Sequence, residues 1–64
     1  MKVRDVIRLV ESDGWVHVRT RGSHRQYKHE KKLGRVTIPG HLGDDIHLDT
    51  LKSILTQAGL RVKP

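Results

Sequence analysis

The chain has 64 residues and a mass of 7.3 kDa, the size of one small domain. It contains no cysteine, which excludes disulfide bonds, thiolate metal sites and thiol nucleophiles. Thirteen Lys and Arg against seven Asp and Glu give a net charge of +6, which is typical of a protein that binds a polyanion such as nucleic acid. No apolar run approaches the ~20 residues of a membrane span and no secretory signal is visible, so we expect a cytoplasmic protein without membrane contact.

The first segment has the spacing of an amphipathic helix. Val3, Val6, Ile7 and Val10 recur at i, i+3, i+4 and i+7, and charged side chains occupy most positions between them. A Ser-Asp-Gly sequence follows, in which Gly14 suits the left-handed conformation found just after a helix. The spacing predicts a helix from about residue 2 to about residue 12.

Three short strands are predicted in the middle of the chain. Residues 15–20 alternate along the chain and are rich in β-branched side chains, which is typical of a strand. Arg21-Gly22 is the predicted two-residue turn, and residues 23–29 form the return strand with Tyr27 as its large apolar residue. Residues 30–34 are a charged loop, and residues 35–38 form a third strand.

The last third of the chain predicts a loop and a second helix. Residues 41–47 have neither periodicity, whereas residues 48–58 carry a helical apolar stripe, followed by Gly59 and by Leu60, which can pack back on the last turn. The resulting order is α-β-β-β-α. We therefore predict a single α+β domain over residues 1–64, with a three-stranded antiparallel sheet and two helices on one of its faces.

The assumed Arg21-Gly22 turn fixes a register for the first hairpin. It pairs Thr20 with Ser23, Arg19 with His24, Val18 with Arg25, His17 with Gln26 and Val16 with Tyr27. The inward face then collects Val16, Val18 and Tyr27. The outward face collects His17, Arg19, His24 and Gln26. A three-residue loop with a bulge would shift this register.

The outward cluster suits chemistry on RNA, which carries its own nucleophile, the 2′-hydroxyl beside the scissile phosphate. Histidine is matched to proton transfer near neutral pH, so His24 is the candidate acid–base group. Arg19 can offset charge that grows on the phosphate, and Gly22 lets a phosphate approach the backbone. The alternative is that His24 is an ordinary exposed residue of a basic strand.

A metal site is not predicted. His24 and His29 lie five residues apart on one strand, so their side chains point to opposite faces. The acidic residues cluster elsewhere, at Asp44, Asp45 and Asp49, and no zinc-type spacing occurs. We expect no metal and no other cofactor.

Several segments of the chain form a recognisable series. They are Arg4-Asp5-Val6-Ile7, Gly14-Trp15, Arg21-Gly22-Ser23-His24, Gln26-Tyr27-Lys28-His29, Val36-Thr37-Ile38-Pro39 and the ending from Thr50 to Leu60. In this order they resemble the HicA family of small toxins from bacterial and archaeal toxin–antitoxin pairs. The Gly-Ser-His step and the Leu-Lys-Ser-Ile-Leu…Ala-Gly-Leu ending are specific in combination. The resemblance covers nearly the whole chain, from Arg4 to Leu60.

This resemblance implies a fold like that of a double-stranded-RNA-binding domain and the activity of a metal-independent mRNA interferase. The family's active histidine corresponds to His24, and the glycine of the same step to Gly22. The implied partners are mRNA and a HicB-type antitoxin, through which any contact with DNA would be indirect.

The remaining candidate residues come from register and charge. Those expected to contact RNA phosphates are Arg19, Ser23, Gln26 and Lys28, and His17 or His29 could protonate the leaving oxygen. Two other functions stay open: an RNA-binding module without catalysis, and a DNA-binding accessory protein. The latter is disfavoured because the second helix has only Lys52 as a basic residue.

Overall fold

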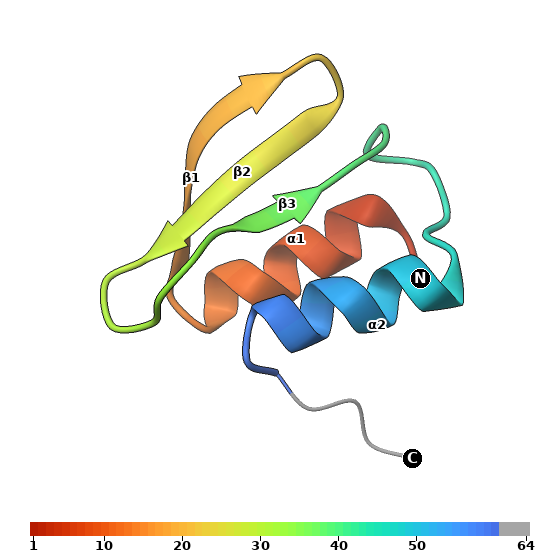
Figure 1. Ribbon diagram of the computed structural model, residues 1–64. Helices are drawn as coiled ribbons and strands as arrows, with labels where there is room; N and C mark the ends of the chain where they lie inside the picture. The colour runs from red at the N-terminus through yellow and green to blue at the C-terminus, as the bar shows by residue number, and fades with distance from the viewer. Residues whose placement is uncertain (61–64) are drawn as a thin grey trace.

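The computed structural model describes residues 1–60 and has the predicted α-β-β-β-α order (Figure 1). The elements are α1 (Val3–Ser12), β1 (Trp15–Arg21), β2 (His24–His29), β3 (Val36–Ile38) and α2 (Leu48–Gln57). Each helix and strand boundary lies within one residue of its prediction. The last four residues of the predicted domain, 61–64, lie outside the described residues.

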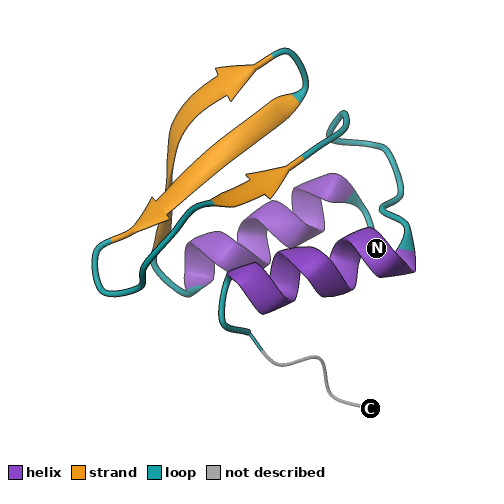
Figure 2. Cartoon of the chain, viewed as in Figure 1, coloured by secondary structure: helices purple, strands orange, loops and turns teal. Residues whose placement is uncertain are grey.

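The strands form one antiparallel sheet in the order β1-β2-β3. Both helices lie side by side against the same face of this sheet, so the α+β prediction is confirmed (Figure 2). We call the uncovered face the outer face and the other the helix side. Within residues 1–60, no helix is long and apolar enough to cross a membrane.

The core fills the layer between the sheet and the helices. The apolar stripe of α1 is buried there, and α2 contributes the last turns of its own stripe. The core residues are Val3, Val6, Val10, Trp15, Tyr27, Val36, Ile38, Ile54 and Ala58. Residues of β2 and β3 that face the helices alternate with residues of the outer face, as expected for a half-buried sheet.

The hairpin between β1 and β2 has a different turn from the predicted one. Arg21 pairs with His24, so the two turn residues are Gly22 and Ser23. Gly22 adopts a φ of +61° and Ser23 does not take a positive φ, which is the pattern of a type II′ turn. The predicted pairs, from Thr20 with Ser23 to Val16 with Tyr27, are therefore wrong.

A β-bulge at Val18 changes the pairing a second time. His17 pairs with Tyr27 and Arg19 with Gln26, so Val18 is an extra residue on β1. Below the bulge, Trp15 pairs with His29. The extra residue interrupts the alternation of faces along β1. The outer face therefore takes Val16, an even-numbered residue, before the bulge and the odd-numbered Arg19 and Arg21 after it.

The inward and outward assignments of β1 are corrected accordingly. Val16 and Val18, expected in the core, are 62% and 45% exposed. The core residue of this strand is Trp15, which is 1% exposed, and Tyr27 is buried as predicted. Val16 shares the outer face with Lys28, its partner on β2.

Both helix ends follow local rules. Gly14, with a φ of +101°, and Gly59, with a φ of +70°, follow α1 and α2 as predicted. The amide of Leu60 donates to the carbonyl of Leu55, and that of Gly59 to Thr56, which is the Schellman arrangement. Leu60 also packs against the core, as expected.

The predicted loop over residues 41–47 packs against the first turn of α1 and accepts hydrogen bonds from its backbone amides. The amide of Val3 donates to the carbonyl of Asp44 at 2.9 Å, and the amide of Arg4 to Leu42 at 3.2 Å. Lys2 and Asp45 form a β-bridge and an ion pair of 3.2 Å. The loop therefore supplies acceptors for amides that have no partner inside the helix.

Candidate active site

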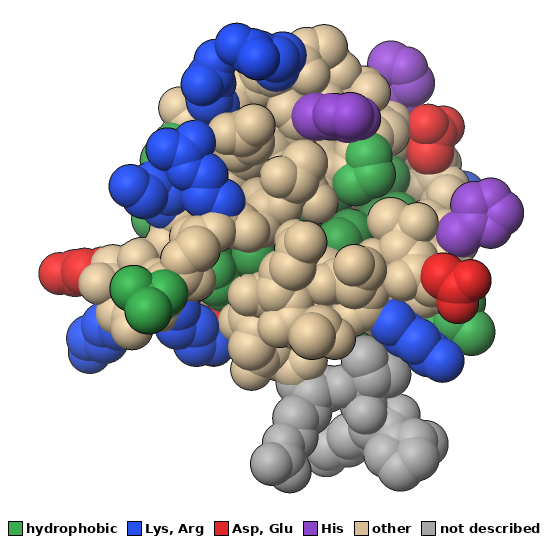
Figure 3. Space-filling model, viewed as in Figure 1, with side chains coloured by type: hydrophobic (Ala, Val, Ile, Leu, Met, Phe, Trp, Pro, Cys, Tyr) green, Lys and Arg blue, Asp and Glu red, His purple; other side chains and the backbone are tan. Residues whose placement is uncertain are grey.

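The outer face of the sheet carries a row of polar and cationic side chains around His24. On β2, His24, Gln26 and Lys28 alternate with residues of the helix side. Their partners on β1 are Arg21, Arg19 and Val16, and Thr37 lies beside Gln26 on β3. Figure 3 shows Lys and Arg side chains gathered over the hairpin region at the upper left. The face is therefore basic and open to solvent.

His24 begins β2, directly after the turn, and its side chain is exposed. Its cross-strand partner is Arg21, not the predicted Arg19. Directly opposite residues of an antiparallel pair have Cβ atoms about 4.5–5.5 Å apart, so a guanidinium and an imidazole can contact the same anion there. Arg19 lies one step further along the same face, opposite Gln26.

The turn before His24 is open to solvent around Gly22. A Cβ atom added to Gly22 would meet no atom within 4 Å, so the glycine is required by its positive φ and not by crowding. Ser23 completes the turn and is partly buried. Both residues therefore lie next to His24 at the turn end of the hairpin.

His17 does not join this cluster, in contrast to the prediction. Its Nε2 atom is 2.7 Å from the hydroxyl oxygen of Thr20, and its ring packs edge-on against Tyr27, with centroids 5.5 Å apart. Tyr27 faces the core, and its burial raises the pKa of its hydroxyl, with a further rise from the Glu11 carboxylate. His17 thus faces the helix side, away from His24.

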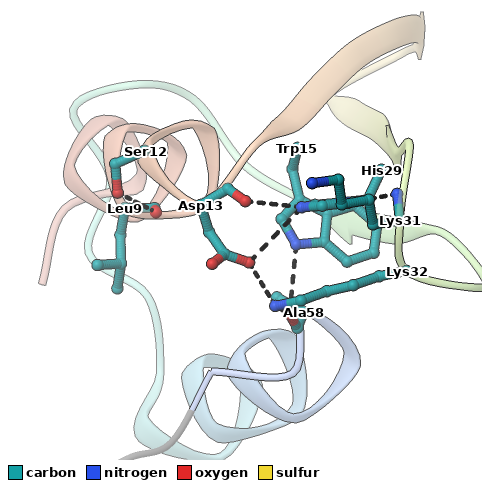
Figure 4. A network of polar contacts seen from close by, with 8 residues as sticks. All are labelled: Leu9, Ser12, Asp13, Trp15, His29, Lys31, Lys32 and Ala58. Atoms are coloured by element: carbon teal, nitrogen blue, oxygen red, sulfur yellow. Dashed lines mark hydrogen bonds and ion pairs between the residues drawn. The ribbon is translucent and has the colours of Figure 1, made fainter.

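His29 also faces the helix side and has both ring nitrogens occupied (Figure 4). The amide of Lys31 donates to Nδ1 at 2.9 Å, which leaves the proton on Nε2, and Nε2 donates to the carbonyl of Asp13 at 2.7 Å. The ring lies edge-on against Trp15, with centroids 5.3 Å apart. These contacts favour a packing role for His29.

The same network joins the end of α1 to the end of α2 (Figure 4). Lys32 donates to the carboxylate of Asp13 and, at 3.0 Å, to the carbonyl of Ala58, which also accepts from the indole of Trp15 at 3.3 Å. The hydrogen bond from Lys32 holds the pKa of the Asp13 carboxyl below its usual value, outweighing its partial desolvation. Lys32 thus has a structural role, because its ammonium group joins the end of α1 to the end of α2.

The structure also adds residues that the sequence pattern missed. Arg21 was assigned to the turn but lies on the outer face opposite His24. A Gly-Ser pair is itself a recognised two-residue turn, so reading Gly22-Ser23 as the turn would have found this partner. Arg35 also reaches this face, where it donates to the side-chain oxygen of Gln26 at 2.9 Å.

Comparison with known proteins identifies the family. The family model described as "HicA toxin of bacterial toxin-antitoxin" matches residues 3–60, which include both helices, the whole sheet and His24. No curated protein matches the chain. The chain therefore belongs to the HicA toxin family of bacterial toxin–antitoxin systems.

Proposed function

We propose that this HicA toxin is an endoribonuclease that cleaves mRNA without a metal ion, with His24 as its acid–base group. The observation that carries the proposal is the pairing of exposed His24 with Arg21 on the open outer face. A proton acceptor and a fixed positive charge stand side by side on the surface of a chain with a net charge of +6, a balance that favours contact with polyanions.

The chemistry needs little beyond these groups because the substrate supplies its own nucleophile. In the proposed reaction, His24 takes the proton of a ribose 2′-hydroxyl, and the 2′-oxygen attacks the adjacent phosphorus. The bond to the 5′-oxygen breaks, which leaves a 2′,3′-cyclic phosphate and, once that oxygen is protonated, a 5′-hydroxyl. Arg21 offsets the negative charge that accumulates on the phosphate oxygens in the transition state.

The two faces of the sheet bear on the source of the second proton. His17 and His29 were candidates for protonating the leaving oxygen, but both face the helix side. We therefore propose that this proton comes from water or from another group of the outer face. In this proposal the neighbouring phosphates and the sugar–phosphate backbone of the RNA are bound by five residues around His24, namely Gly22, Ser23, Arg19, Gln26 and Lys28.

Membership of a toxin–antitoxin family implies a cognate antitoxin partner. We propose that it is a HicB-type protein whose acidic surface covers the outer face and that DNA is contacted only through it. Opposite charges would speed the association of the two proteins at low salt. Lys28→Glu should then slow complex formation at low ionic strength, and an unchanged association rate would contradict this step.

An RNA cleavage assay in the presence of EDTA tests the proposed reaction. The parent protein should cut single-stranded mRNA, His24→Ala should not, and mapped product ends should carry the cyclic phosphate. His41→Ala, which removes an exposed loop histidine, is the matched control and should cleave like the parent. Cleavage by His24→Ala at the parent rate would refute the assignment.

A second candidate function is RNA binding without cleavage. One observation favours it. Of the three histidines on the strands, only His24 lies on the outer face, so the described residues place no second strand histidine there to protonate the leaving oxygen. If parent and His24→Ala proteins both bind RNA with steep salt dependence and neither cleaves it, the protein is a binding module.

A further inference from the structure

The side chains of Arg35 and Gln26 form a pair on the outer face, one step along the sheet from His24. Arg35 directly precedes β3, and its Nη1 atom donates to the Oε1 atom of Gln26 at 2.9 Å. Gln26 lies at the centre of the sheet, between Arg19 on β1 and Thr37 on β3. The pair is therefore surrounded by polar side chains on both neighbouring strands.

The chemistry of the two groups fixes the orientation of the Gln26 amide. A guanidinium carries only donors, so it donates to the carbonyl oxygen of the amide and cannot pair with the amino group, which is also a donor. The amino group of Gln26 must then point away from Arg35, and within residues 1–60 it donates to no protein acceptor. Arg35 thereby engages the amide oxygen and leaves the amino group of Gln26 as the outward donor.

A group of outward-pointing donors of this kind matches a phosphate. The remaining N–H groups of Arg35, the amino group of Gln26 and the guanidinium of Arg19 opposite it offer no acceptor to repel a phosphate oxygen. Residues two apart on one face of a strand are separated by about 6.8 Å. This is comparable with the separation of successive phosphates in an extended nucleic-acid strand, so a phosphate at Gln26 would neighbour one at His24.

We propose that Arg35 is a positioning residue that holds the Gln26 amide with its amino group outward, and that the two side chains together bind the phosphate next to the one cleaved at His24. This inference rests on the proposed function for the identity of the cleaved phosphate. The binding step itself requires only a single-stranded nucleic acid on the outer face.

A methylphosphonate scan tests the pair without requiring cleavage. The probe is a short single-stranded RNA with 2′-O-methyl groups throughout, which cannot be cut, and with one uncharged methylphosphonate linkage at successive positions. For the parent protein, the linkage at the Arg35–Gln26 subsite should weaken binding about tenfold, the effect of losing a charged hydrogen bond. In Arg35→Ala and Gln26→Ala, the same linkage should weaken binding less than about twofold.

Three further variants separate orientation from charge. Arg8→Ala removes an equal charge from the exposed side of α1. For this variant, the methylphosphonate linkage should weaken RNA binding at the same position and by the same factor as for the parent. Arg35→Lys can still donate to Oε1 and should retain part of this effect. Gln26→Glu can still pair with Arg35 but offers no donor, so it should bind more weakly than Gln26→Ala. Equal losses at every linkage in parent, Arg35→Ala and Gln26→Ala proteins would overturn the proposal.

Kinetics distinguish a failure of this inference from a failure of the proposed function. If the parent cleaves RNA, Arg35→Ala should raise KM with little change in kcat, because a neighbouring phosphate is held equally in the ground and transition states. His24-dependent cleavage without a position-specific methylphosphonate loss would refute only the role of Arg35. A position-specific loss in a protein that cleaves no RNA would refute only the nuclease proposal.

Discussion

His24 and His29 begin and end the same strand, β2, and their side chains lie on opposite faces of the sheet. The imidazole of His24 is exposed beside Arg21, whereas that of His29 is 10% exposed and bonded through both nitrogens. One strand thus carries one histidine suited to chemistry and one suited to packing. Because the two lie five positions apart on opposite faces, a change at one can be made without altering the contacts of the other.

The first prediction is that His29→Ala destabilises the fold, whereas His24→Ala does not. The His29 variant loses hydrogen bonds to Asp13 and Lys31 and the edge-on contact with Trp15, worth about 2–4 kcal/mol together. His24→Ala should change the free energy of unfolding by less than about 0.5 kcal/mol. Urea unfolding followed by Trp15 fluorescence measures both, and equal losses in the two variants would contradict their division of roles.

Gly14 gives a prediction in which conformation and contact add. A Cβ atom at this position would lie 2.8 Å from the Nε2 atom of His29, and the φ of +101° is itself strained for any other residue. Gly14→Ala should therefore destabilise the protein by more than about 2 kcal/mol.

Two other glycines separate the contributions. Gly34 also has a positive φ, of +82°, but an added Cβ would meet nothing within 4 Å, so Gly34→Ala should cost only about 1–2 kcal/mol. Gly43 has neither constraint, and Gly43→Ala should be neutral or stabilise by up to about 1 kcal/mol. Thermal unfolding should give Gly14→Ala a lower melting temperature than Gly34→Ala. If it does not, the close approach of His29 to Gly14 has no energetic consequence.

The ion pair between Asp13 and Lys32 predicts a dependence of stability on pH. Folding lowers the pKa of Asp13 from its ordinary value of 3.8, chiefly through the hydrogen bond from Lys32. The folded state therefore binds this proton less tightly than the unfolded state. The stabilisation is present above the unfolded pKa and is lost as the pH falls through the folded pKa.

Urea unfolding of the parent and of Asp13→Asn between about pH 6 and about pH 2 measures this effect. The difference in unfolding free energy should be constant at the upper end and should shrink below about pH 4. Asp49→Asn, which removes an exposed carboxylate from the first turn of α2, is the control. A parent-minus-Asp13→Asn difference that stays constant over the whole range would contradict the coupling to Lys32.

The helices and the order of the strands could be predicted from local patterns. The valine stripe of α1 depends only on spacing along the chain, the glycines at positions 14 and 59 mark the helix ends, and β2 follows β1 as the return strand of a hairpin. The contacts of Lys32 and Arg35 could not be predicted in this way. They join residues 26 and nine positions apart, and no spacing rule within one helix or strand relates them.

The candidate site was predicted in part, and the reason lies in two register errors of different size. Placing the turn at Arg21-Gly22 displaced each partner by two residues along β2, which preserves the residues that share a face. Arg19, His24 and Gln26 were therefore assigned to the same face correctly. The bulge at Val18 adds a displacement of one residue, which exchanges the faces, so His17 was misplaced. A bulge leaves no clear mark in an alternating sequence.

The last prediction tests this register through two valines on opposite faces. Val16 is 62% exposed on the outer face, whereas Val36 is fully buried on the helix side. Replacing valine by threonine keeps the branched shape and the preference for strands but adds a hydroxyl. Val36→Thr should cost about 1–3 kcal/mol because the hydroxyl is buried among apolar side chains, and Val16→Thr should change stability by less than about 0.5 kcal/mol. A loss at Val16 as large as that at Val36 would restore Val16 to the core and remove the bulge from β1.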